Sequence, residues 1–302
     1  MNLNKLIYKK KTALRHRLEK HQKLQKLTTT LYLNYCSTTG FLHLLPDFYI
    51  IGFVKCGTTS MYEYLMQHPC VHPPKGKEIS YFDRLYYKGI NWYKAAFPSK
   101  FHKYINKNFR NKEFQTGEAT PQYIEHPHAL SRIKKITPNA KFIVLLRNPV
   151  DRTFSQYARN LKNDYEYRTF SDALKHESER IQGRYEKMET DDKYYSWDYE
   201  IYGYLEHGIY AKKLERWLRI FPKEQFMIIQ SEEFLRNISG TYQQVLKFLG
   251  LPKWEPEEYI LYKHRQSRDQ MDPVLRKQLV EYFRPYNKQL YKLIGRKFDW
   301  DE

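Results

Sequence analysis

The stretch between residues 48 and 67 constrains the possible fold more than any other part of the sequence. An apolar run at 48–51 is followed by a loop bounded by Gly52 and Gly57, and three hydroxyl residues at 58–60 open a helical pattern. A strand, a glycine loop and a helix in this order predict a phosphate-binding turn. The reason is that loop N–H groups and the positive end of the helix dipole point toward the anion.

The position of the lysine distinguishes this loop from the ATP- and GTP-binding P-loop. That motif reads G-x-x-x-x-G-K-[ST], with the lysine directly after the second glycine. Here Thr58 takes that place, and Lys55 lies two residues before Gly57. A lysine there reaches the far side of a bound phosphate, and the hydroxyls of Thr58, Thr59 and Ser60 add donors. The alternative is an ordinary strand-to-helix turn with an exposed lysine.

Composition narrows the class of partner. The 302 residues are 41% apolar, which suffices for a full core in one or two domains. The formal net charge of +18 predicts an anionic ligand or surface, although general solubility is the alternative. The chain has three cysteines, Cys36, Cys56 and Cys70. Because their number is odd and their spacing is not that of metal ligands, we expect no disulfide framework and no metal site.

Residues 1–30 differ in composition from the rest of the chain. Nine Lys or Arg residues face one acid, Glu19, so this segment carries +8 of the net charge. Leucines at roughly helical spacing predict a basic amphipathic helix, which either lies on an acidic membrane or packs its leucines on the main domain. We expect a basic helical extension at 1–46 and one domain at 47–302. With no signal-peptide core or membrane span in the sequence, we expect a cytoplasmic location.

From residue 48 the pattern alternates between strands and helices. This predicts an α/β, P-loop-like three-layer domain with a central parallel sheet flanked by helices. The expected strands are 48–53, 79–82, 115–118, 141–146 and 225–230. The expected helices are 58–67, 128–136, 150–160, 171–176, 210–220, 239–249 and 273–294. The stretch at 185–204 is rich in tyrosine and acid with little apolar period, so we expect a long loop or lid there.

A second strand end carries a cation. The strand predicted at 141–146 is followed by Arg147, where a nucleotide hydrolase commonly has an aspartate that helps to hold magnesium. Ser155 follows about one and a half turns into the next helix. Arg147 and Ser155 can therefore converge on a second anion, the arginine through its planar fork and the serine through its hydroxyl. The alternative is a helix capped by Asn148, with Arg147 pairing a neighbour.

Together these two elements resemble a known family. The loop Gly52-Phe-Val-Lys55-Cys-Gly57-Thr58-Thr59-Ser60 and the segment Arg147-Asn-Pro-x-x-Arg152-x-x-Ser155-x-Tyr157 are similar to motifs of the sulfotransferases that use 3′-phosphoadenosine 5′-phosphosulfate (PAPS). The resemblance covers about residues 47–300, and bacterial-type and heparan-sulfate-type members look closest. It implies a P-loop-like α/β fold and metal-free transfer of a sulfuryl group from PAPS to a hydroxyl, with 3′,5′-adenosine bisphosphate as the product.

The resemblance also implies how the cofactor is held. Lys55 would stabilise the leaving phosphate oxygen as its negative charge develops. The 5′-phosphate would contact Lys55, Cys56, Gly57, Thr58, Thr59 and Ser60. The 3′-phosphate would contact Arg147 and Ser155. Where relatives carry Lys-Gly-Arg against the 3′-phosphate, this chain reads Lys263-His-Arg265, so Lys263 and Arg265 are further candidates without the intervening glycine.

A base must still accept the proton of the acceptor hydroxyl. Glu78 lies in a segment that resembles Glu-x-x-x-Phe-Asp of heparan-type members, whose glutamate is the proposed base. We expect it at the start of the second strand, facing the cleft near Lys55. The alternative is a surface pair of Lys77 with Glu78. Cytosolic members use a histidine instead, and possible rivals here are His68, His72, His126 and His128.

The acceptor is the least constrained part of the prediction. Glu118 and Tyr123 lie in a segment resembling Glu-Lys-Thr-Pro-x-Tyr of heparan-type enzymes, which implies substrate-binding roles. Ala119 replaces the lysine that helps those enzymes to bind an anionic saccharide. Saccharide, lipid, small phenol and peptide tyrosine all stay open as acceptors.

The favoured hypothesis is a PAPS-dependent sulfotransferase acting on a carbohydrate or other small-molecule hydroxyl by in-line displacement, with no nucleic-acid partner. One alternative is a P-loop nucleotide kinase, which the place of Lys55 and the missing strand-end aspartate disfavour. The other is a non-enzymatic module that binds polyanions or a membrane surface through residues 1–30.

Overall fold

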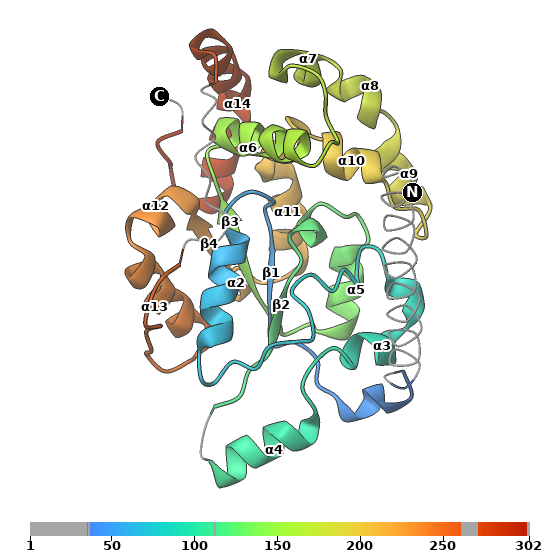
Figure 1. Cartoon of the computed structure of the whole chain (residues 1–302), viewed down its shortest axis with the longest axis vertical. Coiled ribbons are helices and arrows are strands. Elements are labelled where there is room, and N and C mark those ends of the chain that lie inside the picture. The colour runs from blue at the N-terminus through green and yellow to red at the C-terminus, as the bar shows by residue number, and fades with distance from the viewer. Residues whose placement is uncertain (1–34, 36, 111–112, 261–270, 301–302) are drawn as a thin grey trace, which may run out of the picture.

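The computed structural model describes residues 35, 37–110, 113–260 and 271–300. Its centre is a parallel sheet with the strand order β2-β1-β3-β4 (Figure 1). The strands are β1 (Phe48–Gly52), β2 (Gly117–Ala119), β3 (Lys141–Leu146) and β4 (Phe226–Gln230). Every residue of β1 and β2 is buried, which is the pattern of strands covered on both faces. The predicted α/β class is confirmed.

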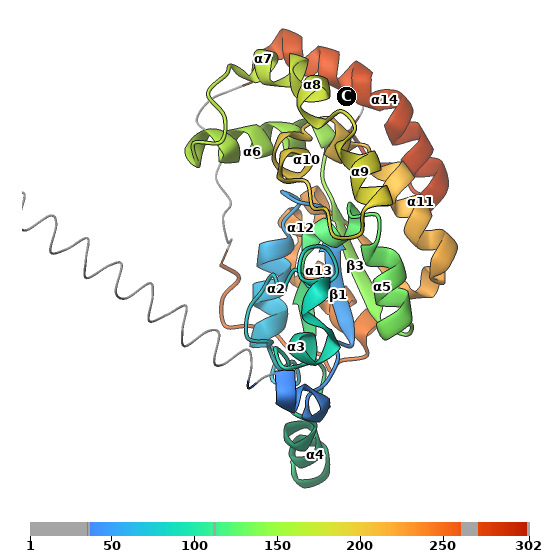
Figure 2. The ribbon, with the colours of Figure 1, turned by 90° about the vertical axis from the view of Figure 1, so that its right-hand side faces the viewer.

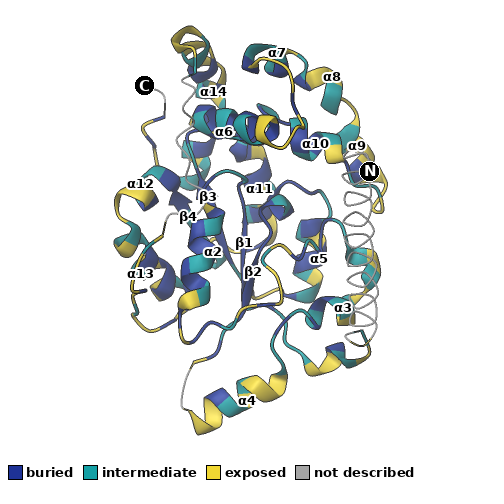
Figure 3. Cartoon of the chain, viewed as in Figure 1, coloured by how far each residue is buried: buried dark blue, intermediate teal, exposed yellow. Residues whose placement is uncertain are grey.

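Helices cover both faces of this sheet. Figure 2 shows α2 (Thr58–Gln67) on one face, and α5 (Ala129–Ile136) and α11 (Tyr210–Ile220) on the other. The long helix α14 (Pro273–Ile294) packs outside α11. The sheet and its two helical layers form the predicted three-layer domain, and Figure 3 shows that burial concentrates along the strands.

Several of the remaining helices, among them α6 (Pro149–Lys162) and α7 (Phe170–Lys175), lie beyond the carboxyl ends of the strands (Figure 1). These two and α13 (Ile238–Leu249) agree with the sequence-based prediction. Others were not predicted: α3 (Ile90–Lys94), α4 (Lys100–Phe109), α8 (Glu177–Ile181) and α12 (Ser231–Arg236). The described residues also form the 3₁₀ turns η1 (Gly40–Leu42), η2 (Tyr86–Lys88), η3 (Pro121–Ile124), η4 (Glu206–Gly208) and η5 (Lys223–Gln225).

The strand predicted at 79–82 is wrong, because the chain turns there. Ser80 has a φ of 52°, and its carbonyl oxygen accepts from the N–H groups of Arg84 at 3.2 Å and Leu85 at 3.0 Å. Tyr81 stacks on Tyr93, with ring centroids 4.4 Å apart. The apolar character of this run therefore reflects packing between rings and not pairing between strands.

The long loop predicted at 185–204 is also wrong. This stretch contains most of α9 (Arg184–Thr190) and all of α10 (Trp197–Tyr202). The Ser196 hydroxyl caps α10 by accepting from the Tyr199 N–H at 3.1 Å. The Tyr199 ring packs edge-on against His207, with centroids 4.9 Å apart. The buried residues are Met188 in α9, and Tyr199 and Ile201 in α10. So few buried positions leave no apolar period in the sequence.

Two predictions concern residues at the start of the chain. The basic segment 1–30, and most of the extension predicted at 1–46, lie outside the described residues. Within the part of the chain that the structure describes, the helices are too short or too polar to cross a lipid bilayer.

Candidate functional site

The loop between β1 and α2 has the backbone form of an anion-binding turn. Gly57, the N-cap of α2, has a φ of 89°, a left-handed conformation that glycine adopts without strain. The Phe53 N–H donates to the Leu145 carbonyl oxygen of β3 at 2.8 Å, which ties the loop to the neighbouring strand. On the other side, the Ser231 hydroxyl lies 2.7 Å from the Cys56 carbonyl oxygen. The loop is therefore fixed beneath the first N–H groups of α2, which lack intrahelical partners as at any helix start.

The side chains of this loop lie at different depths. Thr58 and Ser60 are buried, whereas Lys55 and Thr59 are half-buried. Lys55 has a φ of 72°, a conformation that costs a residue with a Cβ atom about 1–2 kcal/mol. Such backbone strain persists where the surrounding contacts fix it, and it concentrates at functional sites.

Arg147 reaches the same loop from the end of β3. Its guanidinium donates to the Lys55 carbonyl oxygen at 3.4 Å, across 92 positions of sequence. Its own carbonyl oxygen accepts from the Tyr210 hydroxyl at 2.8 Å. The two elements meet because β1 and β3 are parallel neighbours, so their carboxyl ends lie at one edge of the sheet. Lys263 and Arg265, the further candidates for this site, lie outside the described residues.

Asn148 fixes the start of α6, the helix that carries Ser155. Its side chain accepts from the Val150 N–H at 3.0 Å, and its N–H donates to the Glu232 carboxylate at 2.8 Å. The cap that the sequence offered as an alternative is therefore present. Ser155 lies half-buried on the second turn of α6, eight residues after Arg147.

Arg152, to which the sequence motif assigned no role, lies behind the phosphate loop between β1 and α2. Its side chain is fully buried. Its Nε donates to the Val54 carbonyl oxygen at 3.3 Å and its Nη1 to the Tyr204 carbonyl oxygen at 2.7 Å. Arg152 thus joins the phosphate loop to the segment after α10. Its place in the quoted motif was the only sequence signal that could have identified it.

Glu78 lies before the turn at 79–84 and not at the start of a strand, so that part of its prediction is wrong. Its carboxylate pairs with the Lys77 ammonium group at 3.2 Å. Lys77 in turn donates to the Thr59 hydroxyl at 2.7 Å. The predicted surface pair is therefore present, but it adjoins the phosphate loop. Lys77 connects the exposed Glu78 to that loop, a role that the sequence did not indicate.

The four histidines considered as bases lie in different places. His68 is the C-cap of α2 and His72 follows it, so both lie at the far end of the helix from the loop. The Nε2 atom of His128 lies 2.8 Å from the Met188 carbonyl oxygen, within hydrogen-bond distance. His126 lines a cavity of about 30 Å³ together with Val54, which has room for about one water molecule. Burial lowers the pKa of His126 to about 3.

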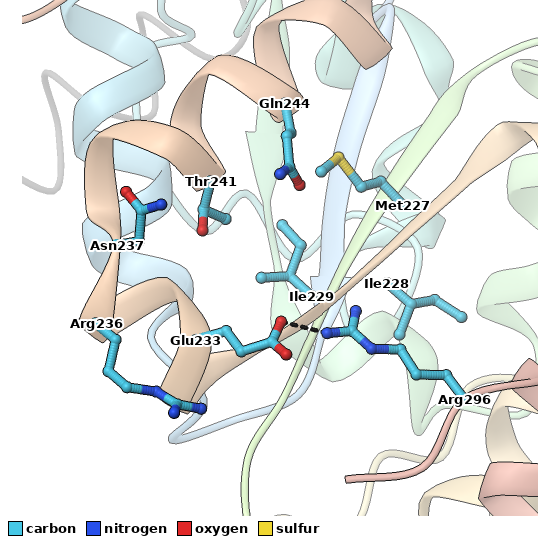
Figure 4. Close-up of a pocket in the computed structure, with 9 residues that line it drawn as sticks. All are labelled: Met227, Ile228, Ile229, Glu233, Arg236, Asn237, Thr241, Gln244 and Arg296. Atoms are coloured by element: carbon cyan, nitrogen blue, oxygen red, sulfur yellow. Dashed lines mark hydrogen bonds and ion pairs between the residues drawn. The ribbon is translucent and has the colours of Figure 1, made fainter.

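A larger cavity, of about 350 Å³, lies beside β4 and contains none of the predicted site residues. Figure 4 shows its lining, in which Glu233 of α12 pairs with Arg296 from the segment after α14. Cavity size alone therefore does not locate the candidate site in this protein.

Glu118 and Tyr123, predicted to bind substrate, lie in the core with no exposed surface. The Glu118 carboxyl accepts from the Tyr93 hydroxyl at 2.7 Å. The Tyr123 hydroxyl accepts from the Tyr81 N–H at 2.9 Å. In this placement neither side chain is open to solvent, so their predicted roles in substrate binding stay a prediction. The segment around β2 instead holds the turn after Glu78 through Tyr123.

We expect Glu118→Gln to flatten the pH dependence of stability. Burial raises the pKa of Glu118 from 4.5 to about 8. Its carboxyl therefore stays protonated in the folded protein while it ionises in the unfolded chain. The contribution of this protonated carboxyl to the free energy of unfolding is complete below its pKa in the unfolded chain. It is lost as the pH rises through its pKa in the folded protein. Between about pH 5 and about pH 8, the wild type should lose on the order of 4 kcal/mol of unfolding free energy through this ionisation. The variant, which has no carboxyl at this position, should not show that loss.

Denaturant unfolding at several pH values measures this effect. Glu224→Gln, which removes an exposed carboxyl from η5, is the matched control and should follow the wild-type profile. Parallel profiles for Glu118→Gln and wild type would contradict the raised pKa.

The chain is similar in sequence to known proteins. The sulfotransferase domain family matches residues 45–289. Heparan sulfate glucosamine 3-O-sulfotransferase 3A1 of Mus musculus is 29% identical over 280 residues, which cover 85% of this chain and 65% of that protein. The membrane-associated sulfotransferase kil1 of Dictyostelium discoideum is 28% identical over 329 residues, covering 86% of this chain and 68% of its own length.

The chain is also similar to a solved structure. The crystal structure of a sulfotransferase from Alicyclobacillus acidocaldarius aligns with a TM-score of 0.65 and 30% identity, over 86% of this chain and all of that one. The chain spans about two thirds of the length of the heparan sulfate relatives, and it belongs to the sulfotransferase family.

Proposed function

We propose that this protein transfers a sulfuryl group from PAPS to a hydroxyl acceptor. The observation that carries the proposal is the contact between Arg147 and the Lys55 carbonyl oxygen. It joins two anion-binding elements at the carboxyl ends of adjacent parallel strands, where ligands of open α/β sheets bind. A nucleotide with phosphates at both its 5′ and 3′ positions requires two such elements.

The chemistry of the surrounding groups fits such a polyanion. The loop side offers backbone N–H groups, the Lys55 ammonium group and the Thr59 hydroxyl, all of which donate. The Arg147 side offers a guanidinium fork suited to phosphate. The nearby Glu232 carboxylate is already engaged by the Asn148 N–H at 2.8 Å and the Trp300 Nε1–H at 3.3 Å. When bound, PAPS supplies the activated sulfuryl group.

Each residue then has a definite task. Lys55 stabilises negative charge that develops on the leaving phosphate oxygen, where electrostatic stabilisation contributes most to rate. The amides at the start of α2, with Cys56, Gly57, Thr58, Thr59 and Ser60, hold the 5′-phosphate. Arg147 and Ser155 hold the 3′-phosphate. Glu78 accepts the proton of the acceptor hydroxyl, and Lys77 orients its carboxylate.

We propose a saccharide hydroxyl as the acceptor. The support is the similarity to heparan sulfate glucosamine 3-O-sulfotransferases over 85% of this chain. Ala119 stands where the heparan-type segment has a lysine, and it is buried. This position therefore supplies no cation to an acceptor.

A thermal shift assay tests the proposal. A ligand that binds only the folded state raises the melting temperature by mass action. We expect a shift with 3′,5′-adenosine bisphosphate and none with ATP and magnesium. The reverse result would overturn the proposal and favour a P-loop kinase.

Arg147→Ala should weaken binding of the bisphosphate without unfolding the protein. Loss of a charge-assisted hydrogen-bond pair costs about 1.5–3 kcal/mol, or roughly 10- to 100-fold in Kd. Isothermal titration calorimetry measures this loss. Arg219→Ala on α11 is the matched control, because Arg219 is exposed and pairs only with Glu215 at 2.7 Å among the contacts described. An unchanged Kd for Arg147→Ala would remove Arg147 from the cofactor site.

A further inference from the structure

Helix α4 exposes aromatic side chains and buries a polar one, which is the opposite of what is usual for a helix on the surface of a protein in water. Its buried residue is Asn106, whereas Phe101 is 70% exposed, Tyr104 57% and Phe109 75%. Surface helices normally bury the apolar face and expose the polar one. Three exposed aromatic rings on one helix of ten residues point to a medium or partner that covers them.

The helix is held firmly enough to present this face. Its first residues are tied to the domain by the backbone bridge between His43 and Ser99, and the Ser99 hydroxyl caps it by accepting from the His102 N–H at 3.2 Å. The His102 ring packs edge-on against the buried Phe114, with centroids 5.3 Å apart. Asn106 donates back to the His102 carbonyl oxygen at 2.9 Å. The bond from Asn106 lies within the helix, whereas the backbone bridge and the His102–Phe114 contact fix which side of α4 faces the domain.

The opposite side combines rings with cations. At 3.6 residues per turn, Phe101 and Tyr104 lie almost diametrically across the helix from Asn106. Lys100 and Lys107, seven positions apart, flank these rings along one side, and both are exposed. The ten residues of α4 include no acid. Exposed aromatic residues bordered by lysines are typical of helices that lie in a membrane interface.

More apolar surface lies at the same end of the molecule. Phe41 and Leu42 of η1 are 57% and 50% exposed. They are close to the start of α4, because His43 pairs with Ser99. Figures 1 and 2 both place α4 at one extreme of the molecule, beyond the amino ends of the strands, while α6 lies beyond the carboxyl ends.

We propose that α4, together with Phe41 and Leu42, docks on an acidic membrane surface. Charge complementarity selects this occupant: anionic headgroups match Lys100 and Lys107, and the acyl boundary accepts the rings. A second copy of the chain fits less well, because pairing two α4 helices would bring like charges together. The candidate site lies at the opposite end of the sheet, so a docked molecule presents its phosphate loop away from the bilayer.

Sedimentation of the full chain with lipid vesicles tests this docking. We expect binding to vesicles of phosphatidylcholine mixed with phosphatidylserine, weaker binding to pure phosphatidylcholine, and release by high salt. The variant Phe101→Ala/Tyr104→Ala/Phe109→Ala should bind at least about tenfold less. The variant Lys100→Ala/Lys107→Ala should lose about 25-fold, or about fivefold per lysine.

Tyr167→Ala is the matched control, because Tyr167 is 82% exposed but lies between α6 and α7 at the other end of the molecule. It should bind as wild type does. All variants should keep the wild-type melting temperature and the wild-type affinity for 3′,5′-adenosine bisphosphate, since α4 is remote from the phosphate loop.

Three results would overturn the proposal. Wild-type vesicle binding by the triple aromatic variant would place the membrane contact elsewhere in the chain. A wild-type dimer that the triple variant converts to a monomer, without vesicle binding, would make this face an interface between copies. Binding of single-stranded DNA that depends on the same rings, again without vesicle binding, would make it a nucleic-acid surface.

Discussion

Replacing Lys55 by alanine is expected to lower kcat for sulfuryl transfer by about 10²- to 10³-fold, or about 3–4 kcal/mol of transition-state stabilisation. The ammonium group counts most where charge develops, and in the proposed reaction that is the leaving phosphate oxygen. Alanine keeps the backbone at the φ of 72° that lysine already adopts, so the fold should survive. Sulfate transfer from PAPS to a saccharide acceptor, followed together with the melting temperature, measures both effects.

Lys253→Ala is the control for a lost surface cation, because Lys253 is exposed and lies outside the phosphate loop. Its kcat should equal that of wild type. Wild-type turnover by Lys55→Ala would remove the lysine from the reaction. A large fall in melting temperature would instead assign it a structural role.

Glu78→Gln should lower kcat by about 10²- to 10⁴-fold, the usual contribution of a general base. In the wild type, the Lys77 ammonium group lies 3.2 Å from a carboxylate oxygen of Glu78. Glutamine keeps the size of this side chain and an oxygen that can accept the same hydrogen bond. It cannot take up the proton of the acceptor hydroxyl. Cofactor binding should therefore be unchanged while turnover is lost, and this split separates a base from a residue that merely shapes the site.

Glu257→Gln, which changes an exposed carboxylate after α13, serves as the control for charge. The rival base is His126, which lines the small cavity beside Val54. Its lowered pKa of about 3 makes it a weak proton acceptor. If His126→Asn abolished turnover and Glu78→Gln retained it, the base would have to be reassigned to the histidine.

The fold was largely predictable because its signals are local. The β3 strand and the α2, α11 and α14 helices have the predicted bounds. Their apolar runs, periodicity and flanking glycine or proline act within a few residues. The two wrong elements, at 79–82 and 185–204, both contain buried tyrosine rings, Tyr81 in the first and Tyr199 and Tyr204 in the second. A buried tyrosine packs equally well in a turn, a strand or a helix, so its presence does not specify one of them.

The candidate site was predictable to a smaller extent. The glycines, lysine and hydroxyls of the loop, and the arginine after β3, could be identified because their order follows a motif. The contributions of Arg152 and Lys77 could not. Arg152 bonds the Val54 carbonyl oxygen 98 positions away, and Lys77 bonds Thr59 18 positions away. No local pattern specifies such pairs.

The sequence by itself determined the parallel α/β sheet and the loop on which the candidate site is built, because backbone conformation and strand burial are encoded over short windows. Only the tertiary structure decided what each polar side chain near that loop contacts. It placed Glu118 and Tyr123 in the core, joined Glu78 to Thr59 through Lys77, and turned the aromatic face of α4 toward solvent. These outcomes depend on segments distant in sequence that meet in space, where burial and hydrogen bonding decide the role of a residue.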